Sequence, residues 1–274
     1  MRKAPSTSGE TAWSPRTLAS LLIIGVCAAS AADSAPGPAT ASASSGKPLR
    51  VGVAKHLPPM VYEEKGQRRG LEADLARGLG EQLGRPVEFV ARKESDLIPA
   101  LLAGKIDIIM SGMTATAERS ARVSFTKPYL RSGQTPLVRV DNAANIQFSL
   151  MWDKHKVGYQ RGTTGEIFVQ RNLPNAEKVP FSTPAAGAKS LVKKKIAVFV
   201  HDAPVNWWLA SIHEADGLTV INAFLTTESI AWAVRKDDPA LLNAANDYLG
   251  TILKDGRLTA AVARWFGHST PPPG

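Results

Sequence analysis

The sequence predicts an α/β protein of two lobes, each a mostly parallel sheet flanked by helices. Apolar strands alternate with helical segments from Leu49 to Phe266, which is typical of parallel sheets with crossover helices. The run Leu101–Gly112 has a counterpart at Leu191–Asp202, and each contains a helix end, a lysine, an apolar strand and a polar turn. Such a repeat predicts two similar lobes, with chance similarity of two apolar strands as the alternative. The 274 residues are enough for two modest domains.

The first lobe is expected to contain three strands and two helices before the chain crosses over. The amphipathic segment 71–83 ends at Gly84 before Pro86, which is a helix stop signal. The segment 106–110 is almost wholly apolar, as a strand covered on both faces would be. The expected strands are Leu49–Ala54, Val87–Ala91 and Ile106–Met110, and the expected helices are Leu71–Leu83 and Asp96–Ala103.

The second lobe repeats this alternation. Leu137–Val140 is expected to carry the chain into it, and Trp232–Arg235 to return the chain to the first lobe. Two crossings of this kind would form a hinge. The expected strands are Lys156–Tyr159, Ile196–Val200 and Leu218–Ile221; the expected helices are Gly165–Asn172, Pro184–Lys193 and Pro204–His213, followed by closing helices Pro239–Lys254 and Thr259–Phe266.

The N-terminus has the features of a secretory signal. Basic residues precede the apolar stretch 18–29, and Ala29-Ser-Ala31 is a small-residue cleavage site. The single cysteine, Cys27, lies in this stretch and is an alternative lipid anchor, although Val26 before it departs from that signal. The expected organisation is a signal peptide at 1–32, a disordered linker at 33–47, lobe 1 at 48–138 plus 230–267, lobe 2 at 139–229 and a tail at 268–274.

The charge balance gives no indication of a nucleic-acid partner. Lys and Arg number 33 against 24 Asp and Glu, but the basic residues are scattered and no nucleic-acid motif accompanies them. No apolar stretch after residue 32 is long enough to span a bilayer. The sequence contains no metal-ligand spacing, phosphate loop or nucleophile elbow, so no metal, cofactor or catalytic residue is predicted.

Small polar residues follow the apolar strand 106–110 directly. Ser111, Gly112 and Thr114 stand at its carboxyl end, where ligands bind in open α/β sheets. Arg119 offers a planar fork that fits a carboxylate. The alternative is a structural turn, with Thr116 capping a helix that contains Arg119.

This segment resembles the family-3 extracellular solute-binding proteins, the receptors of polar amino acid ABC importers. The similarity covers residues 48–267, implies the type II periplasmic binding protein fold, and is most specific from Gly112 to Arg119, followed by Thr126-Lys-Pro-Tyr129. The matching segments before and after it are Leu49–Ala54, Pro58–Tyr62, Gly70–Ala76, Gly162–Gly165, His201–Pro204 and Trp232–Pro239.

The resemblance implies roles for individual residues. Arg119, Gly112 and Thr114 would bind the ligand carboxylate, with Ser111 beside them, and Asp202 would bind the amino group. Both charges of a zwitterion must be paired once water leaves a closed cleft. A second-lobe donor would come from Thr163 or Thr164. The alternatives are an N-cap role for Asp202, and turn or cap roles for the two threonines.

The side-chain pocket departs from the family pattern. Leu57 and Glu94 are expected to line it at positions where the amino acid receptors commonly have aromatic residues, so the ligand need not be a common amino acid. His56 is expected at the surface, with the pocket as the alternative. Trp207 and Trp208 are candidates for the cleft wall, one of them being a core residue.

The sequence therefore predicts a monomeric periplasmic solute-binding protein that closes on a small carboxylate-bearing ligand and delivers it to an ABC permease. One alternative is an enzyme similar to the periplasmic cyclohexadienyl dehydratases. These carry a catalytic glutamate near the position of Val205, and an alkyl group cannot transfer a proton. The other alternative is a sensory or accessory binding protein that acts without a permease.

Overall fold

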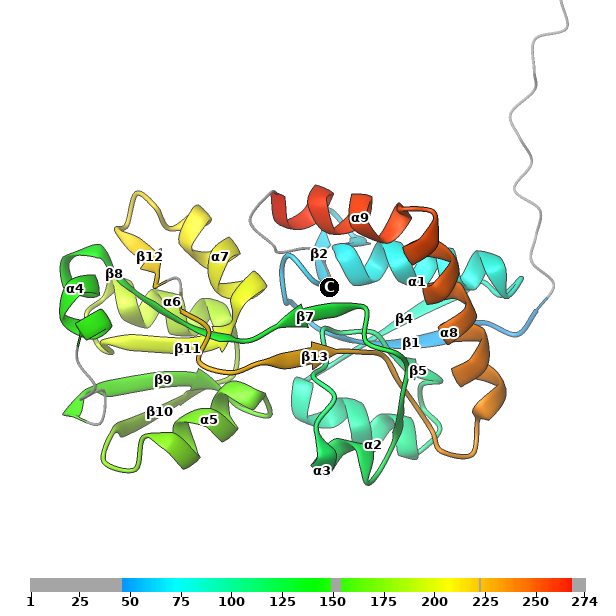
Figure 1. The fold of residues 1–274 in the computed structure, drawn as a ribbon, viewed down its shortest axis with the longest axis horizontal. Helices are drawn as coiled ribbons and strands as arrows, with labels where there is room; N and C mark the ends of the chain where they lie inside the picture. Colours follow the sequence, from blue (N-terminus) through cyan, green and yellow to red (C-terminus); the bar gives the residue numbers. More distant parts are fainter. Residues whose placement is uncertain (1–45, 149–153, 222, 268–274) are drawn as a thin grey trace, which may run out of the picture. The chain divides into compact units, whose positions relative to one another are not determined.

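The computed structural model describes residues 46–148, 154–221 and 223–267. The predicted signal peptide (1–32), the alternative lipid anchor at Cys27, most of the linker (33–47) and the tail (268–274) lie outside the described residues. Within them, two five-stranded sheets are each flanked by helices (Figure 1). We refer to each sheet with its helices as the first and second lobe, in chain order.

The first sheet has the strand order β4-β1-β5-β14-β6. β1 pairs in parallel with β4 and β5, whereas β14 is antiparallel to β5 and β6. Four strands therefore run in one direction and only β14 is reversed. The bounds are β1 Leu49–Ala54, β4 Val87–Arg92, β5 Ile108–Ile109, β6 Ser124–Phe125 and β14 Ala233–Val234.

The second sheet has the order β10-β9-β11-β8-β12 and repeats the same directions. β9 pairs in parallel with β10 and β11, and β8 is the one reversed strand. The prediction of mostly parallel sheets is thus right in strand direction, although half of the neighbouring pairs are antiparallel. The bounds are β8 Gln134–Arg139, β9 Lys156–Gln160, β10 Glu177–Phe181, β11 Val198–Asp202 and β12 Leu218–Val220.

Helices cover both faces of each sheet, so consecutive strand residues enter different cores. In β5, Ile108 packs in the core that includes Leu71 of α1, and Ile109 packs with Leu97 of α2. In the second lobe, α6 and α7 cover one face and α4 and α5 the other. The bounds are α1 Leu71–Gln82, α2 Leu97–Leu102, α4 Val140–Phe148, α5 Thr164–Asn172, α6 Pro184–Val192, α7 Ala203–Ile212, α8 Pro239–Lys254 and α9 Arg257–Phe266.

Short elements complete the first lobe. The hairpin of β2 (Tyr62–Glu64) and β3 (Gln67–Arg69) precedes α1, the 3₁₀ turn η1 (Glu94–Asp96) follows β4, and α3 (Ala117–Ser120) follows β5. η1 and α3 both stand at the carboxyl ends of first-sheet strands. They therefore place side chains where an open α/β sheet binds ligands.

The two crossings between the lobes lie side by side as the antiparallel pair β7 (Leu130–Ser132) and β13 (Glu228–Ile230). The prediction that residues 137–140 carry the chain across is wrong. Leu137 already pairs with Phe199 inside the second sheet, so the first crossing comes earlier, at β7. The local pattern shows that Leu137 and Val138 are buried, but it does not reveal which sheet buries them.

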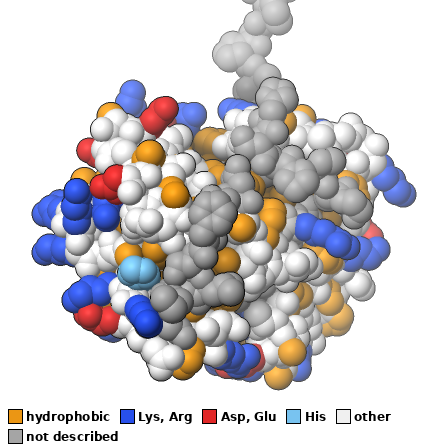
Figure 2. Space-filling view, turned by 60° about the vertical axis from the view of Figure 1, so that its left-hand side comes forward, with side chains coloured by type: hydrophobic (Ala, Val, Ile, Leu, Met, Phe, Trp, Pro, Cys, Tyr) orange, Lys and Arg blue, Asp and Glu red, His pale blue; other side chains and the backbone are white. Residues whose placement is uncertain are grey.

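The basic residues do not form a single patch. Figure 2 shows Lys and Arg side chains in several separate groups over the visible face, with few Asp or Glu side chains among them. This distribution agrees with the scattered basic residues of the sequence, whose formal net charge is +9. Among the described residues, no helix combines the length and the apolar character that a membrane span requires.

Candidate functional site

A small cavity lies where the two lobes face each other. It is lined by all nine residues that the sequence predicts for ligand binding, and by Gln160 and His201 in addition. We call it the central cavity. The nine predicted residues are Leu57, Glu94, Ser111, Gly112, Thr114, Arg119, Thr163, Thr164 and Asp202.

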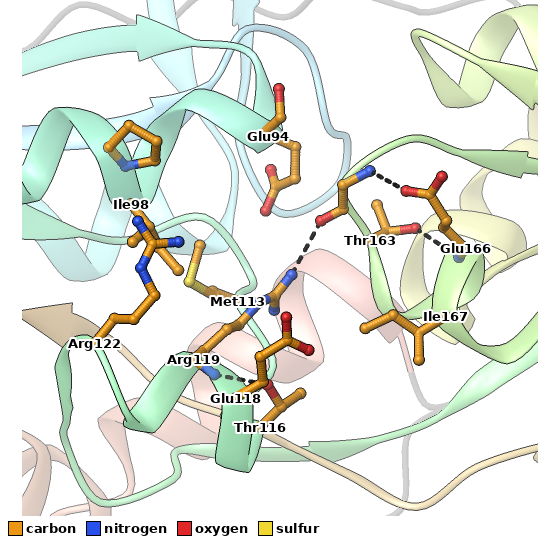
Figure 3. A pocket seen from close by; sticks show the side chains of 13 residues that line it. Glu94, Ile98, Met113, Thr116, Glu118, Arg119, Arg122, Thr163, Glu166 and Ile167 are labelled. Carbon is orange, nitrogen blue, oxygen red and sulfur yellow. Dashed lines mark hydrogen bonds between the residues drawn. The ribbon is translucent and has the colours of Figure 1, made fainter. Parts of the chain in front are cut away.

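The sheet topology explains this convergence. Ser111 and Gly112 follow β5, and Asp202 ends β11, the equivalent strand of the second sheet. The carboxyl ends of these strands face one cleft, which is the usual ligand position in open α/β sheets. One hydrogen bond closes the cleft directly: Arg119 of the first lobe donates from Nη2 to the carbonyl of Gly162 in the second, at 3.0 Å (Figure 3).

Arg119 keeps donors that are free for a ligand. The hydroxyl of Thr116 caps α3 by accepting the Arg119 backbone N–H at 3.2 Å, as the structural alternative predicts. The guanidinium donates to the carbonyls of Thr114 and Gly162 at 2.9 and 3.0 Å. Because a guanidinium carries five N–H donors, the remaining three are enough for a bidentate carboxylate. The cap and the ligand role are therefore compatible.

The turn after β5 differs from the expectation in one respect. The Gly112 N–H donates to Oε1 of the buried Glu72 at 2.6 Å, so it is not available to a ligand carboxylate. Gly112 has a φ of +65°, and a Cβ there would lie 3.1 Å from Cε of Met60. Ser111 accepts the Ala54 N–H at 2.9 Å, and its own hydroxyl proton remains available.

The three threonines of the cavity have already donated their single hydroxyl protons. Thr163 donates to the Gln160 carbonyl at 2.8 Å and caps α5, as the structural alternative predicts. Thr114 and Thr164 both donate to Glu228, at 2.5 and 2.8 Å. These hydroxyls therefore shape the closed cavity and have no proton left for a carboxylate.

Asp202 projects into the cavity with one oxygen free. It occupies the N-cap position of α7, but its side chain accepts no capping hydrogen bond, so the N-cap alternative does not hold. Its Oδ1 accepts from Nε2 of Gln134 at 2.9 Å. The neighbouring His201 donates from Nε2 to Gln160 and accepts the Asp202 N–H on Nδ1, which fixes a neutral imidazole. Oδ2 of Asp202, 3.2 Å from that Nδ1, therefore has no donor there and can accept an ammonium group.

Glu94 is the least satisfied acid of the cavity. Its Oε2 is buried and has no hydrogen-bond partner. Burial is the main cause that raises the pKa of the Glu94 carboxyl to about 7; the carboxylates of Asp202 and Glu72 contribute to this rise, and Arg119 opposes it. Such a carboxylate gains most from a cationic partner.

Two larger openings meet the central cavity at Glu94. One, of about 860 Å³, is lined by Glu94, Glu118 and Glu166 together with Arg119 and Arg122, and we call it the acidic opening (Figure 3). The other, of about 1000 Å³, is lined by four cationic side chains, and we call it the basic opening. These four are Lys55, Arg92, Lys93 and Arg161.

The remaining candidates lie outside the central cavity, and several buried polar residues near it were not predicted. His56 is exposed, as expected. The centroid of its ring lies 6.4 Å from that of Trp208 across the lobes, and neither residue lines the central cavity. Trp207 packs against Phe224 instead. Val205 is 1% exposed and belongs to the core. The unpredicted polar residues are Glu72, Gln134, Gln160, His201 and Glu228, which are all buried.

Metal ligation has no support in the part of the chain that the structure describes. No group of three or more His, Cys, Asp or Glu side chains there could hold a metal ion. The chemistry of the central cavity is instead that of paired charges. It offers one guanidinium, two carboxylates with free oxygens and the Ser111 hydroxyl.

Comparisons with known proteins agree with this architecture. Residues 49–268 match the family model described as bacterial extracellular solute-binding proteins, family 3. ABC transporter arginine-binding protein 1 of Escherichia coli (strain K12) is 30% identical over 233 residues, covering 83% of this chain and 94% of that protein. A probable histidine-binding protein of Neisseria gonorrhoeae is 29% identical over 259 residues, covering 93% and 95%.

Solved structures extend the agreement to the fold. The ancestral amino acid-binding protein AncCDT-1, a precursor of cyclohexadienyl dehydratase, has a TM-score of 0.74 and 38% identity, covering 81% of this chain and 96% of its own. An ancestral arginine-binding protein bound to arginine has a TM-score of 0.74 and 30% identity, covering 81% and 99%. The two-lobe arrangement is therefore the type II periplasmic binding protein fold, and this chain belongs to the bacterial extracellular solute-binding proteins of family 3.

Proposed function

We propose that this protein is a periplasmic receptor for a cationic amino acid, with arginine as the first candidate, and that it delivers this ligand to an ABC permease. Arg119 and Ser111 bind the α-carboxylate, and Asp202 binds the α-ammonium group. Glu94 binds the cationic end of the side chain. The protein acts as a monomer that closes around one ligand.

The charges of the central cavity carry this proposal. They comprise one cation, Arg119, and two acids, Asp202 and Glu94. A neutral amino acid would pair Arg119 and Asp202 but leave the buried Oε2 of Glu94 without a partner. An amino acid with one carboxylate and two cationic groups pairs all three. Since an unpaired buried charge is costly, this complementarity favours a basic ligand over a neutral one.

The two openings that meet at Glu94 indicate in which direction the side chain of the ligand points. The acidic opening adds the carboxylates of Glu118 and Glu166, whereas the basic opening presents Lys55, Lys93 and Arg161. Like charges repel a cationic side chain from the basic opening. We therefore place the side-chain cation between Glu94 and the acidic opening.

The relatives support the same ligand class. One is named an arginine-binding protein and another a probable histidine-binding protein, and a solved structure of AncCDT-1 is described as an ancestral cationic amino acid solute-binding protein. An ancestral arginine-binding protein has also been solved with glutamine. Glutamine is therefore a demanding competitor, because its side chain is polar but carries no charge.

Calorimetry with purified protein tests the proposal. Arginine, lysine and histidine are compared with glutamine for the unmodified chain and for Glu94→Gln. We expect the unmodified chain to bind arginine at least about tenfold more tightly than glutamine, and Glu94→Gln to remove most of that preference. Equal binding of arginine and glutamine by the unmodified chain would refute the cation role of Glu94.

We infer that the protein binds its ligand without converting it. The relationship to a dehydratase precursor makes prephenate the relevant control substrate. At the position implied by that resemblance, Val205 has no ionisable group, and its side chain is packed in the core. We expect no phenylpyruvate above background after incubation with prephenate. Turnover that a cavity substitution abolishes would contradict the receptor assignment.

A further inference from the structure

We propose that Glu228 is a positioning residue that fastens the two lobes in the closed form and seals the central cavity on its hinge side. Glu228 lies on β13, one of the two crossing strands, and is only 7% exposed. The inference rests on the proposed clamp-like binding function, because only such a function requires a closed cleft.

The Glu228 carboxylate accepts four hydrogen bonds, which we call the Glu228 bridge. Oε2 accepts from the hydroxyls of Thr114 and Thr164 at 2.5 and 2.8 Å. Oε1 accepts from the Thr226 hydroxyl at 2.8 Å and from Nε2 of Gln134 at 3.2 Å. Thr114 belongs to the first lobe, whereas Thr164 and Gln134 belong to the second. One oxygen of one carboxylate therefore joins both lobes.

All four donors are neutral, and Glu228 forms no ion pair within the described residues. Hydrogen bonds to an ionised carboxylate are stronger than those between neutral groups. A carboxylate also has room for about four such bonds, so its acceptor capacity is used here. The site is thus built for an acceptor, and a group that also carries protons does not fit it.

The bridge is connected to the ligand site in two ways. Gln134, which donates to Glu228, also donates from Nε2 to Oδ1 of Asp202 at 2.9 Å. Thr114 and Thr164 line the central cavity, and together with Glu228 they also line a groove of about 1180 Å³ outside it. The bridge therefore orients Asp202 and stands between the cavity and that groove.

Opening of the cleft must break the bridge. When the lobes separate, Thr114 and Thr164 cannot both reach the same oxygen of Glu228. Water then has to replace at least one of them, so the bridge favours the closed form over the open form. A contact that exists only after closure mainly slows ligand release and has little effect on association.

The experiment compares Glu228→Gln and Thr164→Val with the matched control Thr227→Val. Thr227 is an exposed hydroxyl residue next to Glu228. In Glu228→Gln, the new amide group would turn its protons toward hydroxyl groups that are themselves donors. Spin labels are placed at Lys93→Cys and Ser182→Cys, which line the basic opening from the two lobes, in a Cys27→Ser background. Distances between the labels report closure with and without arginine, and stopped flow reports arginine association and release.

We expect Glu228→Gln to increase the arginine release rate about tenfold, with association within about twofold of the unmodified chain. The label distances should shift toward the open form even without arginine. Thr164→Val, which removes one of the two hydroxyl donors to Oε2, should show a smaller shift of the same sign. Thr227→Val should behave like the unmodified chain.

Two results would overturn the bridge. One is unchanged label distances and release in both Glu228→Gln and Thr164→Val. The other is a lower melting temperature with unchanged distances and release, which would indicate a purely structural role. If the unmodified chain fails to bind arginine while the ligand-free distances still shift in the variants, the proposed function fails and the bridge stands.

Discussion

The two lobes share a backbone pattern but differ in the side chains at their strand ends. The Asp107 N–H donates to the Arg50 carbonyl at 2.8 Å in the first lobe, and the Ala197 N–H donates to the Lys156 carbonyl at 2.9 Å in the second. The repeat of residues 101–112 in residues 191–202 is therefore a repeat of structure. Equivalent strands carry these contacts in both sheets.

The difference lies in the polar side chains that come after those strands. After β5, the first lobe supplies Arg119 and Ser111 to the central cavity. At the end of β11, the second lobe supplies Asp202, held by the neutral His201 and by Gln134. At these two equivalent strand ends, the first lobe thus presents a cation and the second an anion. The same frame can therefore pair both ends of a zwitterion, and Glu94 of the first lobe adds a second acid to the cavity.

Removing the cation of the first lobe, Arg119, should have the largest effect. Arg119→Ala leaves the ligand carboxylate without its guanidinium and removes the bond to Gly162. We expect arginine affinity to fall at least about 100-fold in calorimetry, because truncating one partner of a buried charge pair costs about 2–5 kcal/mol or more. Arg119→Lys should recover only part, since the fork geometry is lost. Near-normal binding by Arg119→Ala would place the carboxylate elsewhere.

Removing the charge of the second lobe should have a smaller effect. Asp202→Asn keeps the size of the side chain, and one oxygen can still accept from the ammonium group. We expect affinity to fall about 10- to 100-fold, because a hydrogen bond to a charged group is worth about 1.5–3 kcal/mol. Unaltered affinity in titrations of this variant would show that the second lobe does not bind the amino group.

The site was predictable where residues occupy strand ends or match the family motifs. Ser111, Gly112 and Asp202 follow recognisable apolar strands, and their place in an α/β sheet predicts a shared cleft. The hydrogen-bond partner that each donor of the site already has was not predictable. That the Gly112 N–H faces Glu72 depends on where α1 packs, which no local pattern shows.

The polar residues of the hinge were missed for a related reason. Glu228 lies in the short crossing strand β13, and Gln134 is the first residue of β8, directly after the other crossing; neither position belongs to a periodic hydrophobic pattern. Their burial arises only when the two crossings pair and the lobes meet. The prediction of the first crossing was wrong for the same reason, because nothing in the sequence around Leu137 tells which of the two sheets buries it.

A pair of glycines tests how far the equivalence of the lobes extends. A Cβ at Gly52 of β1 would lie 2.2 Å from Cδ1 of Ile106, and one at Gly158 of β9 would lie 2.6 Å from Cδ1 of Ile196. At Gly158 a ring atom of Phe181 also lies at 2.7 Å. We expect alanine at either site to destabilise the fold by about 1–3 kcal/mol. The loss should be larger at Gly158 than at Gly52, because a ring cannot move aside as a methyl group can.

Double variants separate the clash with the isoleucine methyl group from the clash with the Phe181 ring. Ile106→Val removes the clashing methyl group and should rescue most of the stability that Gly52→Ala loses in urea unfolding. Ile196→Val should rescue Gly158→Ala only in part, because the ring of Phe181 remains. Equal rescue in both lobes would show that the aromatic packing of the second lobe adds no constraint.

The smallest expected effect concerns the turn after the outer strand of each sheet. The second lobe has Thr183 there, which caps α6, whereas the first lobe has Glu94, whose turn has no side-chain cap. Burial raises the Glu94 pKa to about 7 from an ordinary value of 4.5, so the folded ligand-free protein holds a proton that the unfolded chain loses. Stability therefore falls as pH rises from about 4.5 to 7 and stays reduced above that range.

Glu94→Gln removes this titration. At pH 8 we expect the variant without ligand to melt about 2–4 °C higher than the unmodified chain, the size expected for roughly 1 kcal/mol in a protein of this length. At pH 4.5 the two melting curves should coincide. With arginine present the order should reverse at pH 8, because only the unmodified chain gains the binding energy of the side-chain cation. A variant that is less stable at pH 8 without ligand would show that the Glu94 carboxylate serves the fold of the first lobe and is not held strained for a ligand.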